Sequence, residues 1–221
     1  MQLSRSRKKR TLALAMVAVA GSLGIGIAAE PAGAATCSDV DIVFARGSGE
    51  LAGLGITGTP FVNSLKTNLT GKSVSSYAVN YAADLAQTSA GPGATDMTRH
   101  VKSVAASCPN TKFVLGGYSQ GASVTDISIG IPTLLGTGET IPTNLAPRVA
   151  AVVVFGNPLA LYGQHIPTAS ALYGSKAKEY CNLGDPVCAA GYNTLAHLTY
   201  GYDGSTTSGA AFAAAKVRAL G

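Results

Sequence analysis

The stretch KFVLGGYSQGASV, residues 112–124, decides the fold, because an apolar run leads directly into a Gly-x-Ser-x-Gly motif. Residues 112–115 have the composition of a buried strand, and a helix-like segment follows the motif. Gly117 and Gly121 carry no side chain, so a strand and a helix can come close on either side of Ser119. The pattern predicts a sharp strand-to-helix turn that presents a nucleophilic serine. A glycine-rich turn with a solvent-facing serine is the alternative.

Strand-like and helix-like segments alternate on both sides of this turn, which is typical of a parallel sheet with helices on both faces. The expected strands are 40–45, 74–81, 112–115, 149–155 and 178–182. One helix is expected to begin at Thr59-Pro60, and a second to end at Cys108. Two more are expected over 120–129 and 210–220. We expect one α/β domain over residues 35–221.

Residues 1–34 have the three parts of an export signal: a cationic start, an uncharged run over 11–29 and the small-residue site Ala32-Gly33-Ala34. The uncharged run is also near the length that spans a bilayer, so a membrane anchor is the alternative. Three glycines in the run and Pro31 before the small-residue site favour cleavage. We expect a cleaved signal peptide, a secreted, extracellular protein and no stable membrane insertion after cleavage.

The basic charge of the chain belongs mostly to this N-terminal segment. The formal net charge is +5, but residues 1–34 hold five of the sixteen basic residues and one of the eleven acidic ones. Residues 35–221 are therefore almost neutral, and we expect no nucleic-acid partner. Only 12% of residues are charged, which excludes a disordered polyelectrolyte.

All four cysteines, Cys37, Cys108, Cys181 and Cys188, follow the export signal. They show no Cys-x-x-Cys spacing, and an oxidising compartment favours disulfides over a metal site. Four cysteines allow three pairings, of which Cys37–Cys108 with Cys181–Cys188 is the simplest.

An activated serine needs an orienting acid and a base, which follow it in that order on this topology. Asp185 comes after the fifth strand on a Gly184 turn, and His197 comes between Asp185 and the last helix. We expect Ser119, Asp185 and His197 to form one catalytic set.

The remaining acids and histidines fit this order less well. Asp126 would lie inside a helix and Glu179 inside a strand. His100 precedes the serine and is expected to be solvated on a helix flank. His165 has only Asp126 and Glu139 between it and Ser119, and no strand end carries either of them.

Four stretches together resemble one known family: DIVFARGSGE (41–50), GYSQG (117–121), YCNLGDPVC (180–188) and HLTY (197–200). They are similar to the cutinase family of serine esterases, and most similar to its actinobacterial branch. The resemblance implies a three-layer α/β/α sandwich with a five-stranded parallel sheet and no large lid. It also implies disulfides Cys37–Cys108 and Cys181–Cys188.

The resemblance assigns roles by matching motif. Ser119 is implied as the nucleophile, His197 as the base and Asp185 as the orienting acid. The oxyanion hole is implied to use the N–H groups of Gln120 and Ser48, with the Ser48 hydroxyl as a third donor. Many relatives carry threonine at the position of Ser48, and either hydroxyl can donate.

These features predict a secreted carboxylic-ester hydrolase that acts through an acyl-enzyme. Short- to medium-chain acyl esters in cutin or lipids are the expected substrates, and the acyl crevice is expected to be lined by Tyr81, Leu85, Val187, Leu195 and Leu198. The partner is thus a polyester, lipid or acylated polymer. No cofactor and no metal are expected, and the protein is expected to be a monomer.

Several alternatives remain at this point. An acetylxylan esterase or a phospholipase of the same fold would use the same residues, and a catalytically silent secreted surface or binding protein could retain the scaffold. Residues 47–52, GSGELA, also match a dinucleotide-binding Gly-x-Gly-x-x-Ala turn. No Asp or Glu occurs over 51–83, where the ribose-binding acid should lie, so this last interpretation is disfavoured.

Overall fold

The structure, a computed structural model, describes residues 37–221. The expected signal peptide therefore lies outside the described residues. The central sheet contains the strands β1 (Val40–Ala45), β2 (Val74–Ala78), β3 (Lys112–Tyr118), β4 (Val149–Phe155) and β5 (Ala177–Tyr180). Their order is β2-β1-β3-β4-β5, and every neighbouring pair is parallel. The expectation of a five-stranded parallel sheet is confirmed.

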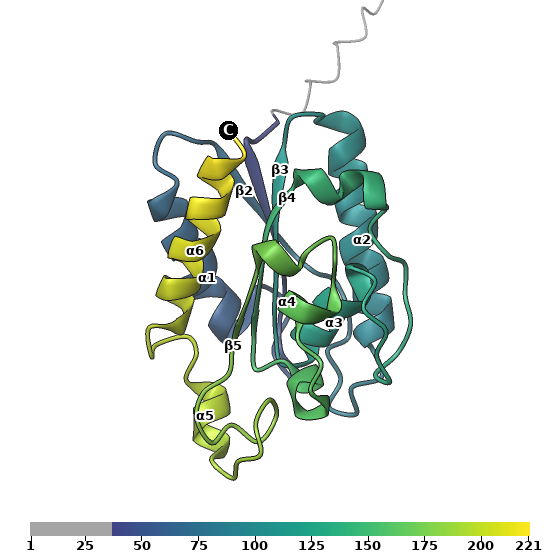
Figure 1. Cartoon of the computed structure of the whole chain (residues 1–221), viewed down its shortest axis with the longest axis vertical. Helices are drawn as coiled ribbons and strands as arrows, with labels where there is room; N and C mark the ends of the chain where they lie inside the picture. Colours follow the sequence, from purple (N-terminus) through teal and green to yellow (C-terminus); the bar gives the residue numbers. More distant parts are fainter. Residues whose placement is uncertain (1–36) are drawn as a thin grey trace, which may run out of the picture. The chain divides into compact units, whose positions relative to one another are not determined.

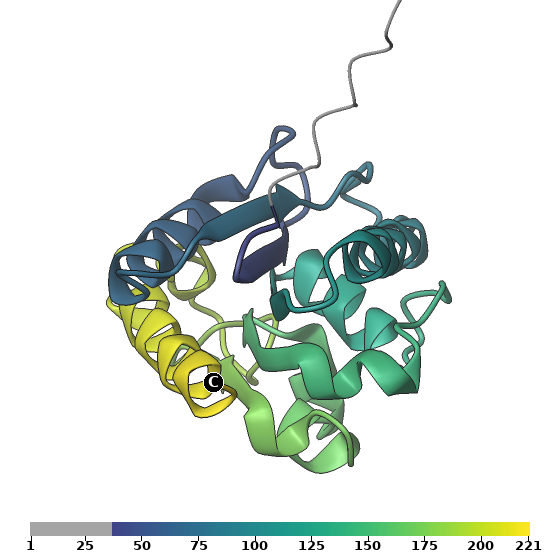
Figure 2. The same cartoon turned by 90° about the horizontal axis from the view of Figure 1, so that it is seen from above.

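Helices cover both faces of this sheet, as Figures 1 and 2 show. One face carries α1 (Gly55–Asn68) and α6 (Ser205–Ala219), which pack on each other, and the other carries α2 (Ala90–Ser107) and α3 (Gln120–Ser128). The shorter helices are α4 (Ile166–Ala169) and α5 (Thr194–Leu198), with 3-10 turns η1 (Thr143–Arg148), η2 (Pro158–Tyr162) and η3 (Gly174–Lys176). The three-layer architecture is thus also as expected.

The burial of the sheet explains why its central strands are so apolar. Every residue of β1 and β4 is buried, because helices exclude water from both faces. Phe44, Phe61 and Phe155 form the aromatic centre of the core beneath α1 and α6. Met97, Val101 and Leu115 belong to the core beneath α2 and α3. The two cores hold the sheet between the helix layers, and the nucleophile candidate Ser119 follows the end of β3.

The start of α1 differs from expectation. The helix begins at Gly55, and Pro60 lies inside it rather than at its first position. The cause is Glu50, whose carboxylate accepts hydrogen bonds from the backbone N–H of Gly47 at 2.5 Å and of Ile56 at 2.7 Å. A carboxylate at the N-terminus satisfies a free N–H group and interacts favourably with the helix dipole. This capping group lies outside the helix, so local periodicity did not reveal the first turn.

Other boundaries also differ. Strand β2 ends at Ala78 instead of residue 81, and β5 spans Ala177–Tyr180 instead of 178–182. Strand β3 continues through Gly116 and Gly117 to Tyr118, because both glycines pair with β1. Helix α6 begins at Ser205, five residues before the expected start. The Asp203 side chain accepts a hydrogen bond from the Ser205 N–H at 2.8 Å and so supports this earlier start.

Two disulfides are present in the structure, Cys37–Cys108 and Cys181–Cys188. The first joins the segment before β1 to the end of α2. The second closes the loop that follows β5. Within residues 37–221, none of the helices has the length and apolar character of a membrane span.

Candidate active site

Ser119 occupies the sharp turn between β3 and α3. Its backbone has φ +56° and ψ −121°, a region that side-chain-bearing residues rarely adopt. A Cβ on Gly117 would lie 1.9 Å from the carbonyl oxygen of Gly121, and a Cβ on Gly121 would lie 2.0 Å from that of Ala45. The two glycines of the motif are therefore required by the close approach of strand and helix. The N–H of Ser119 donates to the Phe155 carbonyl at 2.9 Å, which ties the turn to β4.

Two loops bring His197 and Asp185 to this serine. Asp185 lies in the disulfide-closed loop after β5, and His197 lies in α5. His197 Nε2 is 2.9 Å from Ser119 Oγ, and His197 Nδ1 is 2.8 Å from Asp185 Oδ2. The structure thus brings together the three residues that the sequence placed in one set. Ser119 is only 7% exposed and Asp185 is fully buried.

The polar partners determine how the histidine can react. A carboxylate can only accept, so the His197 Nδ1 atom carries a hydrogen toward Asp185 and Nε2 is free to accept the Ser119 hydroxyl hydrogen. The arrangement can therefore remove a proton from Ser119 as its oxygen attacks an electrophile. The imidazolium that forms would be stabilised by the buried Asp185 carboxylate.

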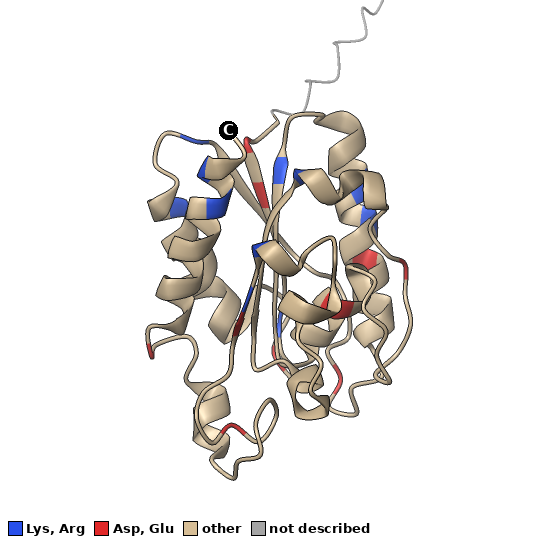
Figure 3. Ribbon diagram, in the orientation of Figure 1, with Lys and Arg blue, Asp and Glu red and all other residues tan. Residues whose placement is uncertain are grey.

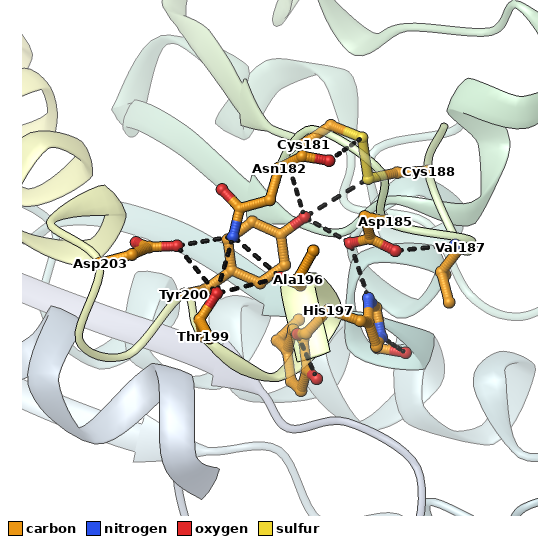
Figure 4. A network of polar contacts seen from close by, with 12 residues as sticks. Cys181, Asn182, Asp185, Val187, Cys188, Ala196, His197, Thr199, Tyr200 and Asp203 are labelled. Carbon is orange, nitrogen blue, oxygen red and sulfur yellow. Dashed lines mark hydrogen bonds and ion pairs between the residues drawn. A yellow bond between two sulfur atoms is a disulfide. The ribbon is translucent and has the colours of Figure 1, made fainter. Parts of the chain in front are cut away.

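Further hydrogen bonds hold this set in place (Figure 4). Oδ1 of Asp185 accepts the N–H of Val187 at 2.7 Å, and Oδ2 accepts the hydroxyl of Tyr200 at 2.5 Å. Tyr118 donates its hydroxyl to the carbonyl oxygen of His197 at 2.8 Å, and the two rings pack with centroids 4.9 Å apart.

Sequence reasoning missed these supporting tyrosines. A signal was available, because both lie within three residues of a member of the catalytic set. Their contacts, however, cross between segments distant in sequence, and Tyr118 lies 79 residues from its partner.

Ser48 lies on the turn that follows β1, and Gln120 directly follows Ser119 in the chain. Gln120 is the first residue of α3, so its backbone N–H belongs to the group that has no partner within the helix. Among residues 37–221, the buried Ser48 Oγ has no hydrogen-bond partner, and neither polar atom of the buried Gln120 side chain has one.

The remaining histidines form separate pairs. His165 Nδ1 lies 2.8 Å from Glu179 Oε2, and His100 Nε2 lies 2.7 Å from Asp41 Oδ2. His100 also stacks on Tyr77, with ring centroids 3.7 Å apart. The expectation that His100 is simply solvated is therefore wrong, because a strand carboxylate and an aromatic ring cover it.

Asp126 is a completely buried acid on α3. Its carboxyl oxygens make no hydrogen bond of normal geometry among the described residues, and the nearby Asn157 side chain offsets only part of the effect of burial on its pKa. Burial raises the pKa of Asp126 well above its ordinary value, and the nearby charge of Glu179 raises it further. No hydrogen bond joins Asp126 to a histidine among the described residues, so it does not take the place of Asp185 beside His197.

A cavity of about 400 Å³ lies beside the loop that carries Asp185, because Pro186 and Val187 of that loop line it. Leu85 and Val187 line it together with Leu135, Tyr162 and others, and none of the lining residues is charged. Leu85 packs within 3.0 Å of the position of a Cβ at Gly49, next to Ser48.

A second cavity, of about 340 Å³, shares Leu135 and Tyr162 with the first and is likewise uncharged. Tyr81, also expected in the crevice, is only 8% exposed and donates its hydroxyl to the Arg46 carbonyl oxygen. It therefore supports the turn at Arg46 from within the core.

Charged and apolar side chains are unevenly distributed over the domain. Lys and Arg gather toward the end where the C-terminus lies, whereas the end that carries α5 shows mainly acidic residues (Figure 3). Large apolar side chains on α5 and its neighbouring loops are exposed: Leu183, Tyr192, Leu195, Leu198 and Tyr202. Over residues 37–221, no group of three or more His, Cys, Asp or Glu side chains is arranged to hold a metal ion.

Comparisons with known proteins identify the family. The family model described as Cutinase matches residues 36–217. A cutinase of Kineococcus radiotolerans is 61% identical over 190 residues, which cover 85% of this chain and 65% of that protein. This chain thus spans a little less than two thirds of that relative. A probable carboxylesterase, Culp3, of Mycobacterium tuberculosis is 46% identical over 186 residues, covering 83% of this chain and 71% of the relative.

Solved structures agree with this assignment. A Trichoderma reesei cutinase in complex with a C11Y4 phosphonate inhibitor has a TM-score of 0.64 at 32% identity, covering 82% of this chain and 77% of that one. An acetyl xylan esterase, solved as an iodinated complex, has a TM-score of 0.71 at 26% identity, covering 82% and 100%.

Proposed function

This chain belongs to the cutinase family of serine carboxylic-ester hydrolases, and on that premise we propose that Ser119 is its nucleophile, His197 its general base and Asp185 the orienting acid. One observation carries the proposal. An unbroken series of hydrogen bonds runs from Ser119 Oγ through both ring nitrogens of His197 to Asp185 Oδ2. The order of the three residues along the chain is also the order that the fold requires.

Acylation begins when Ser119 Oγ attacks the ester carbonyl carbon and its proton passes to His197 Nε2. The C–O bond to the alcohol then breaks, and the departing alkoxide takes that proton from His197. The products are a free alcohol and an acyl group in ester linkage to Ser119. Asp185 stabilises the positive imidazolium without taking its proton.

Deacylation repeats these steps with water. His197 removes a proton from a water molecule, whose oxygen attacks the acyl carbonyl. The bond to Ser119 Oγ breaks, Ser119 recovers the proton, and the carboxylic acid leaves. These steps use only the residues of the chain and water.

The negative oxygen that develops in both steps needs hydrogen-bond donors. We assign this role to the N–H of Gln120 and to the N–H and hydroxyl of Ser48. The buried Ser48 Oγ without a partner supports the assignment, because a polar atom kept unpaired in the folded protein is costly unless a ligand pairs with it.

The uncharged cavity beside Leu85 and Val187 supports an aliphatic acyl group as the substrate part that binds next to Ser119. Its volume of about 400 Å³ leaves room for more than an acetyl group, and Leu135 and Tyr162 line a second uncharged cavity as well. Short- to medium-chain esters of the kind found in cutin or lipids are therefore the proposed substrates. The exposed apolar side chains on α5 suit a substrate presented as a polymer or lipid surface.

A series of p-nitrophenyl esters from acetyl to dodecanoyl tests the substrate class. The expected kcat/KM rises from acetyl to chains of intermediate length. A profile confined to acetyl would instead favour a polysaccharide deacetylase, the activity named for the acetyl xylan esterase of the same fold.

We also propose that residues 1–34 are a signal peptide and that the mature enzyme is a secreted monomer without a nucleic-acid partner. The three-part pattern of these residues, the two disulfides and the near-neutral charge of residues 35–221 support this. The protein recovered from culture medium should begin at Ala35. An N-terminus at Met1, with the protein retained in the membrane fraction, would favour an anchor.

Covalent labelling tests the nucleophile. A fluorophosphonate should modify Ser119 alone in the wild-type protein. Modification of any other serine at a comparable rate would contradict the assignment.

A further inference from the structure

The hydroxyl of Tyr200 lies beside Asp185, where the disulfide-closed loop approaches the segment that carries His197 (Figure 4). The side chain is completely buried. Its oxygen accepts the backbone N–H of Asn182 at 2.9 Å and lies 2.5 Å from Oδ2 of Asp185. A carboxylate oxygen can only accept, so the phenol hydrogen points to Asp185.

Aromatic packing holds the ring of Tyr200, and its hydroxyl lies much closer to Asp185 Oδ2, at 2.5 Å, than to Cys188 Sγ, at 3.4 Å. It packs against Phe155 and Tyr118 with centroids 6.0 Å away in each case, and it lies edge-on to His197 at 6.2 Å. Burial, and next the hydrogen bond to Asp185, raise the pKa of Tyr200 well above its usual value. The hydroxyl therefore stays protonated, and remains a donor, throughout the pH range in which an ester hydrolase is assayed.

Oδ2 of Asp185 thus receives two hydrogen bonds, one from Tyr200 and one from His197 Nδ1. Oδ1 receives the third, from Val187 N–H. Together the three donors fix the rotation of the carboxylate about its side-chain bonds. Without Tyr200, only the Val187 N–H would hold the group against the histidine it has to orient.

Asn182 extends the same connection to the loop that carries His197. Its side-chain amide donates to the Ala196 carbonyl at 2.9 Å and to Oδ2 of Asp203 at 2.6 Å. Its backbone N–H is the group bound by Tyr200. Asn182 therefore joins the start of the loop that carries Asp185 to the segment around His197, and the Tyr200 hydroxyl bonds to both Asn182 and Asp185.

We propose that Tyr200 is a positioning residue for catalysis, which holds Asp185 Oδ2 toward His197 Nδ1 and fixes the distance between the two loops. The inference rests on the proposed roles of Ser119, His197 and Asp185. Tyr200 does not contact the substrate and transfers no proton. It acts on the rate through the orientation of the carboxylate, and hence of the imidazole.

The first test is Tyr200→Phe, which removes the hydroxyl and keeps the ring. Loss of a hydrogen bond to a charged group should lower kcat roughly 10- to 100-fold with KM unchanged. Tyr180→Phe is the matched control, because Tyr180 also packs on Phe155, at 5.2 Å, but donates its hydroxyl to Ser208 at 2.9 Å. The control should keep wild-type kcat. Both variants are assayed where circular dichroism shows them folded.

A double-mutant cycle with Asp185→Ala separates positioning from a purely structural effect. If Tyr200 acts through Asp185, Tyr200→Phe lowers kcat in the wild-type background but changes the residual kcat of Asp185→Ala by less than about 2-fold. An equal loss in both backgrounds, or no loss in the wild-type background, would overturn the inference. Asp185→Ala with wild-type kcat would instead overturn the proposed catalytic set, so the two failures are distinguishable.

A third measurement applies even if Tyr200→Phe does not fold. Site-specific 3-fluorotyrosine at position 200 keeps the ring and hydroxyl but makes the phenol a stronger donor. The far-downfield proton resonance of the His197–Asp185 hydrogen bond should move, because both donors share Oδ2. The same substitution at position 180 should leave it unmoved. A resonance that is unchanged by fluorination of position 200 would contradict the proposal.

Discussion

The carbonyl oxygen of Gly121 lies where a side chain on Gly117 would begin, 1.9 Å from the position of a Cβ at that glycine. Real Cβ atoms do not come so close to a backbone oxygen, so β3 and α3 can meet only if position 117 has no side chain. This contact forces the chain to turn sharply between the two glycines. As a result, Ser119 has a positive φ and its hydroxyl points to His197.

Gly117→Ala should therefore destabilise the whole domain. The strand and the helix must separate to accept the methyl group, and overpacking of this kind costs about 1–3 kcal/mol or more. The melting temperature measures the effect. Gly163→Asn is the control, because Gly163 has φ +67° with open space around it, a conformation that asparagine tolerates. Equal melting temperatures for the two variants would show that the approach of β3 and α3 can relax.

The short disulfide Cys181–Cys188 should matter more for turnover than for stability. It closes a loop with a sequence separation of 7, for which chain entropy predicts a contribution of about 2.4 kcal/mol. The loop contains Asp185, and Cys188 Sγ lies 3.4 Å from the Tyr200 hydroxyl. Replacing both cysteines by serine should lower kcat by up to ~10²-fold at a temperature where the variant is folded.

Cys37–Cys108 provides the matched comparison for this experiment. It closes a separation of 71 residues, for which the same relation gives about 4.4 kcal/mol. Its replacement by two serines should lower the melting temperature more and leave kcat near the wild-type value. If the Cys181/Cys188 variant kept wild-type kcat while folded, the packing of the loop alone would suffice to hold Asp185.

Asp126 should make stability fall as the pH rises. Its pKa in the folded protein is raised well above 3.8, so above about pH 4 the unfolded chain loses a proton that the folded protein keeps. The free energy of unfolding then decreases with pH until the folded pKa is reached. Asp126→Asn removes this loss, and its advantage over wild type should grow by up to about 1.4 kcal/mol per pH unit in that window.

Urea denaturation at a series of pH values between 4 and 8 measures this difference. Asp39→Asn is the contrasting control, because hydrogen bonds from the Ser73 N–H and hydroxyl lower the pKa of Asp39. The stability that this acid contributes is lost only as the pH falls through its lowered pKa. The difference between Asp39→Asn and wild type should thus be constant from pH 5 to 8. A constant difference for Asp126→Asn as well would contradict the neutral, buried acid.

The acyl cavity yields a specificity prediction. Leu135 lines both of the uncharged cavities, so Leu135→Trp should fill part of each. We expect kcat/KM to fall roughly 10-fold or more for long acyl chains, with little change for acetyl and butyryl esters. Leu220→Trp, on the exposed residue after α6, controls for the added indole. An equal loss for every chain length would mean that the acyl group binds elsewhere.

Much of this fold could be predicted because its determinants are local. The buried strands β1 and β4 are short apolar runs, and the glycines around Ser119 mark the turn by their spacing. The order of Ser119, Asp185 and His197 restricted the candidates further, since parallel strands end at one edge of the sheet.

The features that escaped prediction depend on contacts between distant segments. The first turn of α1 is capped by Glu50 from outside the helix, and Pro60 gave a misleading start signal. Tyr81 was predicted to line the acyl crevice, but its side chain is buried in the core and bonds to the Arg46 carbonyl oxygen. Tyr200 lies close to His197 in sequence, yet its hydroxyl serves Asp185, and only the meeting of the two loops reveals that role.

The most direct test of the account is the kcat/KM of Ser119→Ala on a medium-chain p-nitrophenyl ester, measured beside its melting temperature. Alanine and serine pay a similar free-energy cost for the positive φ at this turn. The variant should therefore fold with a near wild-type melting temperature. Without Oγ there is no nucleophile for His197 to activate, and kcat/KM should fall on the order of 10⁴-fold or more. A folded Ser119→Ala variant that retains most of the wild-type kcat/KM would contradict the assignment of Ser119 as the nucleophile.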